Sequence, residues 1–265
     1  MQFTDQTGYG FSLPRKAERI VSLVPSQTEL LHDLGLNDQV VGITRFCVHP
    51  DTWFRNKTRI GGTKDFSLEK IRNLKPDLIL AAKEENTASL IFELREEFPV
   101  WTSDISHLGQ ALEMITEVGR LTGKEAAAQN IVIKINDAFN SIASGLFKDK
   151  KVLYYIWKDP WLVAGQDTFI ADMLLRCGFS IYPAGTRYPE LPPEQLQGEG
   201  VDFILLSSEP FPFRDEHRNQ LQHLYPEARV LLVDGEYFSW YGSRLADAPA
   251  YFHSLAETGN SLYRN

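Results

Sequence analysis

The sequence predicts an α/β protein of two similar lobes with mainly parallel sheets, joined by one long connecting helix. Apolar runs that suit buried strands alternate with segments of helical character, and this order is written twice along the chain. A stretch rich in helix-forming residues separates the two copies. We therefore expect an N-terminal lobe at 1–122, a connecting helix at 123–147 and a C-terminal lobe at 148–265.

The first copy starts with a strand and a helix whose limits can be read from local signals. The apolar run 20–24 suits a buried strand. Ser26 and Glu29 have the spacing of a capping box, so we expect the helix to begin there and to end at Gly35. The next strand is expected at 40–43.

The first copy then continues with the same alternation. The segment LEKIRNLKPDLILAA predicts a short helix, a Lys-Pro-Asp turn and a strand at 78–82. Helices are expected at 90–98 and 108–121, with a short strand at 100–102 between them.

The second copy repeats this order. KVLYYIW predicts a strand, and DTFIADMLLRCGF predicts a capped helix that ends at Gly178. PEQLQGEGVDFILLSS matches LEKIRNLKPDLILAA almost element for element. The apolar run 228–234 corresponds to the strand that carries Trp101. Two such runs in succession indicate two similar lobes.

Between the copies, apolar residues recur close to a 3.6-residue period at Ala127, Ile131, Ile135, Ala138 and Ile142. A helix over the whole segment would be about 30 Å long at 1.5 Å per residue, enough to cross from one lobe to the other. The alternative is a surface helix that packs on one lobe.

Composition excludes several classes of protein. The chain has 265 residues and a formal net charge of −8, which argues against a nucleic-acid partner and against adsorption to anionic lipid. No stretch approaches the roughly 20 apolar residues of a membrane helix. We expect Cys47 and Cys177 to be semi-buried thiols, with a disulfide as the alternative. Residues 1–13 do not read as a signal peptide, so either a leader was removed or the protein stays in the cytoplasm.

Several segments together resemble the helical-backbone class of periplasmic binding proteins, which serve ABC importers of cobalamin, ferric siderophores and haem. These segments are RIVSLVPSQTELL, VVGITRFCVHP, GGTKDFSLEKIRNLKPDLILA and FIADMLLRCGF, and the resemblance runs from Arg19 to Glu257. It implies a pair of Rossmann-like lobes joined by one long helix, with small opening motions and a metal chelate held in the cleft between the lobes. It further implies a monomeric receptor in the periplasm or cell envelope, with an importer permease as its partner and no cofactor of its own.

The resemblance also carries over to individual positions. It implies ligand contacts in the loops after the first two strands, at Pro25, Ser26, Gln27, Arg45, Phe46 and Cys47. It implies that Glu69 and Glu194, at equivalent points of the two copies, dock on the importer. The loop after LILAA is Lys83–Glu84–Glu85–Asn86, where cobalamin binders are often rich in tryptophan and glycine, and this departure puts cobalamin itself in doubt.

Aromatic residues follow the strands of the second copy. Ligands of parallel α/β sheets bind at the carboxyl ends of the strands, so we expect a binding surface from Trp157, Trp161, Tyr188, Phe211, Tyr237 and Trp240. Flat apolar faces with a few polar groups suit a planar macrocycle or a catecholate chelate. Arg45 and Arg187 would add positive charge for an anionic ligand. The alternative is that half of these aromatic residues pack in the cores of the lobes.

The sequence lacks the signatures of a metal site or of catalysis. Cys47 and His49 are only two local donors, whereas a structural zinc site needs four, although either could contact a chelated metal axially. There is no Walker loop or nucleophile elbow, and the spacing of Asp104 and His107 is that of a helix start. The alternatives to a receptor are a cytosolic enzyme that handles tetrapyrroles or metal chelates, and a cytosolic ligand sensor.

Overall fold

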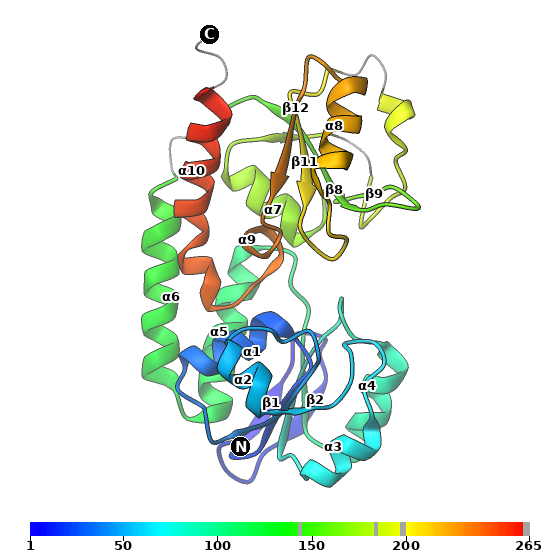
Figure 1. The fold of residues 1–265 in the computed structure, drawn as a ribbon. Helices are drawn as coiled ribbons and strands as arrows, with labels where there is room; N and C mark the ends of the chain where they lie inside the picture. The colour runs from blue at the N-terminus through cyan, green and yellow to red at the C-terminus, as the bar shows by residue number, and fades with distance from the viewer. Residues whose placement is uncertain (143–144, 183–184, 197–199, 262–265) are drawn as a thin grey trace. The chain divides into compact units, whose positions relative to one another are not determined.

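The protein divides into two compact units, each held together by contacts among its own residues, which we call the N-lobe and the C-lobe (Figure 1). The computed structural model describes residues 1–142, 145–182, 185–196 and 200–261. The N-lobe consists of Met1–Ile105, Gly109–Ile135 and Tyr241–Arg244, and the C-lobe of Ser106–Leu108, Asn136–Trp240 and Leu245–Asn265. The short segment Tyr241–Arg244, which we call the strap, therefore contacts the N-lobe although the chain on either side of it belongs to the C-lobe.

The N-lobe is built around a five-stranded parallel sheet in the order β5-β4-β3-β6-β7. Its central strands are buried on both faces, as parallel strands covered by helices are, whereas the edge strand β5 is exposed. They are β3 (Ile20–Ser22), β4 (Val40–Ile43), β5 (Thr58–Arg59), β6 (Leu78–Ala82) and β7 (Val100–Ser103). A separate antiparallel hairpin is formed at the N-terminus by β1 (Gln2–Thr4) and β2 (Gly10–Ser12).

The helices that follow these strands are α1 (Pro25–Asp33), α2 (Asp51–Asn56), α3 (Leu68–Leu74), α4 (Ala88–Arg95) and α5 (Leu108–Thr122). The predicted capping box at Ser26 is wrong. Helix α1 begins one residue earlier, at Pro25, whose fixed φ suits the first turn of a helix, and apolar Val24 is the N-cap. The predicted end of this helix is confirmed, because Gly35 has a φ of +73° directly after the C-cap.

The C-lobe repeats the architecture with a second, mainly parallel sheet in the order β10-β8-β11-β12. A further strand, β9, pairs antiparallel with β8. The strands are β8 (Lys151–Trp157), β9 (Leu162–Val163), β10 (Ser180–Ile181), β11 (Phe203–Ser207) and β12 (Arg229–Val233). Two lobes with mainly parallel sheets confirm the predicted fold class.

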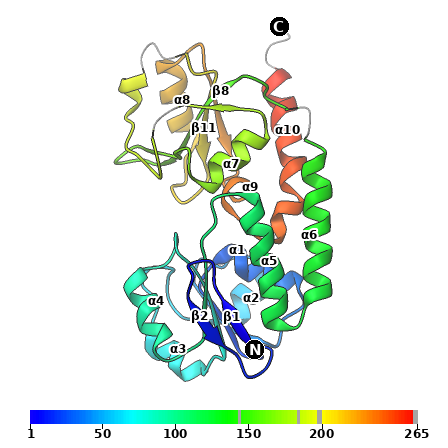
Figure 2. The same cartoon turned by 180° about the vertical axis from the view of Figure 1, so that it is seen from behind.

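The C-lobe helices are α7 (Phe169–Arg176), α8 (Asp215–Leu224), α9 (Glu236–Ser239) and α10 (Ala248–Ser261), with 3-10 turns η1 (Pro193–Leu196) and η2 (Ser243–Ala246). Helices α7 and α8 cover opposite faces of the sheet (Figures 1 and 2). The two copies are less alike than predicted at one point, since η1 stands where the first copy has α3. Residues 197–199 of that segment lie outside the described residues.

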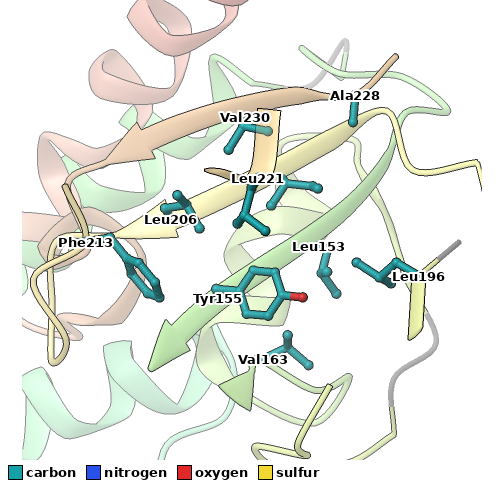
Figure 3. Close-up of a cluster of buried hydrophobic side chains, with 10 residues drawn as sticks. Leu153, Tyr155, Val163, Leu196, Leu206, Phe213, Leu221, Ala228 and Val230 are labelled. Atoms are coloured by element: carbon teal, nitrogen blue, oxygen red, sulfur yellow. The ribbon is translucent and has the colours of Figure 1, made fainter. Parts of the chain in front are cut away.

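Successive side chains of a strand in the C-lobe sheet point to opposite faces, and one of these faces carries a buried apolar core. Leu153 and Tyr155 of β8 lie with Leu206 of β11 and Val230 of β12, under Leu221 of α8 (Figure 3). Tyr154 points to the other face, where its ring lies 5.2 Å from that of Phe238.

The predicted connecting helix is present as α6 (Glu125–Asn140) but is shorter than 123–147. Gly123 has a φ of +72°, a left-handed conformation that separates α5 from α6, and residues 143–144 lie outside the described part of the chain. The division between the lobes falls inside α6, between Ile135 and Asn136. Of the helices in the described ranges, none has the length and apolar character needed to cross a membrane.

Candidate functional site

Each sheet has one place where the connections from two neighbouring parallel strands go to opposite edges of the sheet. In the N-lobe this place lies between β3 and β6, and in the C-lobe between β8 and β11. The loops that follow such strands open a crevice at the carboxyl end of a parallel sheet, where α/β proteins bind ligands. Each lobe therefore has its own candidate surface, formed by the loops after β3, β4 and β6 in the N-lobe and by the loops after β8 and β11 in the C-lobe.

In the C-lobe these loops bring aromatic rings together. Trp157, the last residue of β8, is 39% exposed, and its ring meets that of Phe211 edge-on at 5.7 Å. Phe211 contacts Phe213 at 4.8 Å, and Trp161 stacks on Phe213 at 5.8 Å. We call these four residues the aromatic ridge. Trp157 is its most exposed member, while the other three pack against the core cluster of this lobe.

Cationic and polar side chains border the ridge. The ammonium group of Lys158 lies 5.7 Å from the ring of Trp161, within the range of a cation–π contact. The ring of His217 lies 5.4 Å from that of Phe211, and its Nδ1 accepts a hydrogen bond from the amide of Arg214. Burial and the nearby charge of Lys158 lower the pKa of His217, which favours the neutral ring. The ridge thus combines apolar faces with one close positive charge.

Arg187 and Tyr188 lie in a loop that pairs with the segment after β9. The amide of Gly165 donates to the Arg187 carbonyl at 2.7 Å, and the exposed guanidinium of Arg187 lies 5.7 Å from the ring of Tyr188. Their side chains form a cation–π pair that is separate from that of Lys158 and Trp161.

In the N-lobe, the loop after β3 is mostly turned inward. Pro25 is half-buried, whereas Ser26 and Gln27 are 2% and 0% exposed. The amide of Gln27 donates to the Ser103 hydroxyl at 2.9 Å and to the Ala81 carbonyl at 3.3 Å. Gln27 therefore ties α1 to β6 and β7.

The loop after β4 presents one exposed pair and one buried thiol. Phe46 is 49% exposed, and the guanidinium of Arg45 lies 5.0 Å from its ring and 3.1 Å from the carboxylate of Asp65. Cys47 is fully buried, and its sulfur lies 3.1 Å from the hydroxyls of both Thr28 and Thr44. Burial raises the pKa of Cys47 to about 11, so its thiol is protonated at neutral pH.

This burial speaks against axial contact from Cys47 to a chelated metal, because the thiolate is the form that binds metals. Cys47 and Cys177 are both buried free thiols, as predicted, and the disulfide alternative is wrong. Within the described ranges, no group of three or more His, Cys, Asp or Glu side chains is arranged to hold a metal ion.

The loop after β6 holds two residues whose roles the sequence did not reveal. The side-chain amide of Asn86 donates to the carbonyls of Thr63 and Leu23 and accepts from the amide of Ala82, so it joins three loops. The carboxylate of Glu85 accepts a hydrogen bond of 3.0 Å from the hydroxyl of Tyr241 in the strap. The available signal for Asn86 was its place in the polar loop that follows a fully buried strand.

In the segment after β12, the two aromatic residues predicted to bind ligand also contact other side chains of the C-lobe. Trp240 is 6% exposed, and its indole N–H donates to the carboxylate of Glu209 at 2.8 Å. The ring of Tyr237 stacks on that of Tyr251 at 4.5 Å. Both residues thus take part in the packing of the C-lobe, as the alternative view of the aromatic residues expected for half of them.

The predicted docking residues are exposed on both lobes. Glu69 lies in the first turn of α3, which is capped by the Ser67 hydroxyl, and Glu194 lies in η1. Negative charge in a first turn is favourable in itself, because the amides of that turn carry partial positive charge.

The sequence matches the periplasmic binding protein family over residues 20–224. It is similar to an uncharacterized ABC transporter substrate-binding lipoprotein of Bacillus subtilis, with 31% identity over 64% of this chain and 57% of the relative's length. The chain thus spans little more than half of that relative.

The fold is similar to that of the periplasmic vitamin B12 binding protein of Vibrio cholerae, with a TM-score of 0.78 and 21% identity over 92% of this chain and 98% of that chain. For the periplasmic heme binding protein of Vibrio cholerae the TM-score is 0.74 and the identity 23%, over 89% of this chain and 98% of that chain. Because the family match covers most of the sequence and the fold agrees throughout, the chain belongs to the periplasmic binding protein family, whose members bind substrates and are not enzymes.

Proposed function

We propose that this protein is the cell-envelope receptor of an ABC importer and that it binds a metal chelate. The observation that carries the proposal is the exposed face of the aromatic ridge, with Trp157 outermost and Lys158 beside it. A flat apolar wall next to a positive charge suits a planar or catecholate chelate that carries anionic groups. The candidate ligands are cobalamin or another corrinoid, a ferric siderophore, and haem.

The N-lobe contributes a second surface of the same chemistry. Phe46 offers an exposed ring, and the guanidinium of Arg45 lies against it. We assign direct ligand contact to Pro25, Arg45, Phe46, Trp157, Trp161, Arg187, Tyr188 and Phe211. The remaining members of the predicted set would act instead by holding the loops that carry these residues; they are the buried Ser26, Gln27, Cys47 and Trp240 and the partly buried Tyr237.

The named functions of relatives support the class of ligand without selecting one. A similar protein is named an ABC transporter substrate-binding lipoprotein, and proteins of similar fold are named for vitamin B12 and for heme. The same relatives support a permease as the partner and the cell envelope as the location. Glu69 and Glu194, one exposed carboxylate on each lobe, are the residues we assign to contact with that permease.

Ligand titration tests the proposal. The purified protein would be titrated with cyanocobalamin, haemin, a ferric tris-catecholate and a ferric tris-hydroxamate, and the heat of binding would be measured. One class is expected to bind with a Kd of about 1 μM or tighter and to be recovered chemically unchanged. Absence of binding across the whole panel would contradict the assignment of a metal chelate.

The contribution of the ridge can be measured with one substitution. Trp157→Ala should weaken binding of that chelate by roughly tenfold or more, because truncating an aromatic anchor in a binding site costs on the order of 2 kcal/mol. Phe92→Ala removes an aromatic side chain that is 67% exposed on α4 and serves as the matched control, with unchanged affinity. Equal affinity of the Trp157 variant and the wild type would remove the ridge from the site.

A further inference from the structure

Residues 61–66 of the N-lobe, in the loop after β5, are held against the loop after β4. The amide of Arg45 donates to the Gly61 carbonyl at 2.7 Å, which joins the two loops through their backbones. The side-chain amide of Asn86 donates to the Thr63 carbonyl at 2.8 Å. Asn86 is 7% exposed, so this anchor is buried. The loop after β5 is therefore fixed at two points.

A glycine in this loop lets three side chains meet. A Cβ atom added to Gly62 would lie 2.1 Å from a carboxylate oxygen of Asp65. The same atom would lie 3.1 Å from the guanidinium of Arg45 and 3.2 Å from the ring of Phe46. The three side chains thus close over bare backbone, and glycine is the residue that permits so close an approach.

Asp65 neutralises the positive charge that Arg45 brings to this surface. The guanidinium donates to both carboxylate oxygens of Asp65, at 3.1 and 3.3 Å, and lies 5.0 Å from the Phe46 ring. The cation in the loop after β6 is paired in the same way, with Lys83 lying 2.6 Å from Asp104. Ion pairs between exposed side chains add little to stability, so the main effect of Asp65 is on the charge that the surface presents.

We propose that Asp65 is a specificity-determining residue of the N-lobe. Its carboxylate cancels the charge of Arg45, so the surface around Phe46 accepts an uncharged flat or apolar part of the chelate and disfavours carboxylate and catecholate groups. That this surface contacts ligand rests on the proposed function, whereas the charge that it presents is a property of the protein without ligand.

Two nitroxides of similar size, the anionic carboxy-PROXYL and the cationic aminomethyl-PROXYL, measure that charge in the full chain without ligand. Each probe enhances the relaxation of the Phe46 amide proton according to how often it comes close. In Asp65→Asn the ratio of the anionic to the cationic enhancement should rise by about threefold, because an uncompensated unit charge at about 4 Å in water acts on a monovalent probe with more than the thermal energy.

Controls separate this effect from a change of structure or of net charge. Asp65→Glu keeps the carboxylate and should keep the wild-type ratio. Glu117→Gln removes the same charge from a surface pair with Arg120 on α5 of the same lobe and should leave the ratio at Phe46 unchanged. The effect of Asp65→Asn should vanish at about 1 M salt, where the Debye length is about 3 Å. Equal ratios for Asp65→Asn and the wild type at low salt would overturn the proposal.

The chelate identified by titration gives a second measurement. Asp65→Asn should tighten binding of an anionic chelate, such as the ferric tris-catecholate, by about threefold. It should change the Kd of an uncharged chelate, such as the ferric tris-hydroxamate, by less than about twofold. An anionic chelate with unchanged affinity would overturn the proposal. If no chelate of the panel binds, the proposed function fails, and the nitroxide measurement still decides the role of Asp65.

Discussion

Glu209 is a partly buried carboxylate whose donors, Ser239 and Trp240, are both uncharged. Burial raises its pKa, and the nearby carboxylates of Glu236 and Asp234 raise it further, against the lowering effect of the two hydrogen bonds. Glu29 also has a raised pKa because of burial, but it pairs with the guanidinium of Arg244. At the scale of the residue, the two carboxylates thus share a raised pKa but differ in their partners, which are uncharged for Glu209 and cationic for Glu29.

The unfolding free energy should report the raised pKa of Glu209. A group whose pKa is raised by folding binds its proton more tightly in the folded state, so its stabilising contribution is present below the unfolded pKa of 4.5 and is lost as the pH rises through the folded value. Urea unfolding at several pH values from about 4 to 7 should therefore show Glu209→Gln gaining stability relative to the wild type as the pH rises. Glu29 is present in both proteins and cancels in the difference. A difference that is constant with pH would contradict the raised pKa.

At the scale of the element, the central strands were predictable because they are buried and so consist of apolar runs, as at 78–82. The short strands β1, β2, β5, β9 and β10, which have exposed or partly buried residues, were not predicted. The start of α1 was not predictable, since Ser26 and Glu29 have the spacing of a capping box but lie inside the helix. The site was predictable only in part. Trp157 ends β8 and Trp240 follows β12 and the short helix α9. Trp240 is buried and bonded to Glu209, which is 31 residues away in sequence and carries no local signal.

The N-termini of α1 and α7 allow a test of whether the Ser26 hydroxyl caps its helix. The Thr168 hydroxyl accepts from the Ala171 amide and caps α7, so Thr168→Ala should cost about 1 kcal/mol of unfolding free energy. The hydroxyl of Ser26 is buried and has no hydrogen-bond partner among the described residues. Ser26→Ala should therefore leave the stability unchanged or raise it. Denaturant unfolding measures both, and a loss of about 1 kcal/mol in Ser26→Ala would restore the capping role to Ser26.

At the scale of the whole molecule, the family assignment removes one of the alternatives left by the sequence. The family is not enzymatic, so a chelate-handling enzyme is no longer a candidate. Of the two residues proposed to contact the permease, Glu69 belongs to the N-lobe and Glu194 to the C-lobe. The residues proposed for docking differ from those proposed for ligand contact, so the two proposed functions can be tested separately.

Uptake assays in cells that depend on this protein would test that separation, using the chelate identified by titration. Glu69→Ala and Glu194→Ala should each lower uptake, and more so together, while the Kd for the chelate stays at the wild-type value. Glu96→Ala and Glu227→Ala remove exposed carboxylates elsewhere on the N-lobe and the C-lobe and should leave uptake unchanged. Wild-type uptake by the double variant would exclude the docking role.

The strap also sets an order for the completion of the fold during synthesis. Glu29 and Glu85 emerge from the ribosome early, but Arg244 and Tyr241, which bind them, emerge only after nearly the whole C-lobe has been made. The N-lobe therefore cannot reach its final packing while translation of the C-lobe is still under way. A nascent chain halted before the strap would expose the first turn of α1, where Gly242 later packs, to chaperones and proteases.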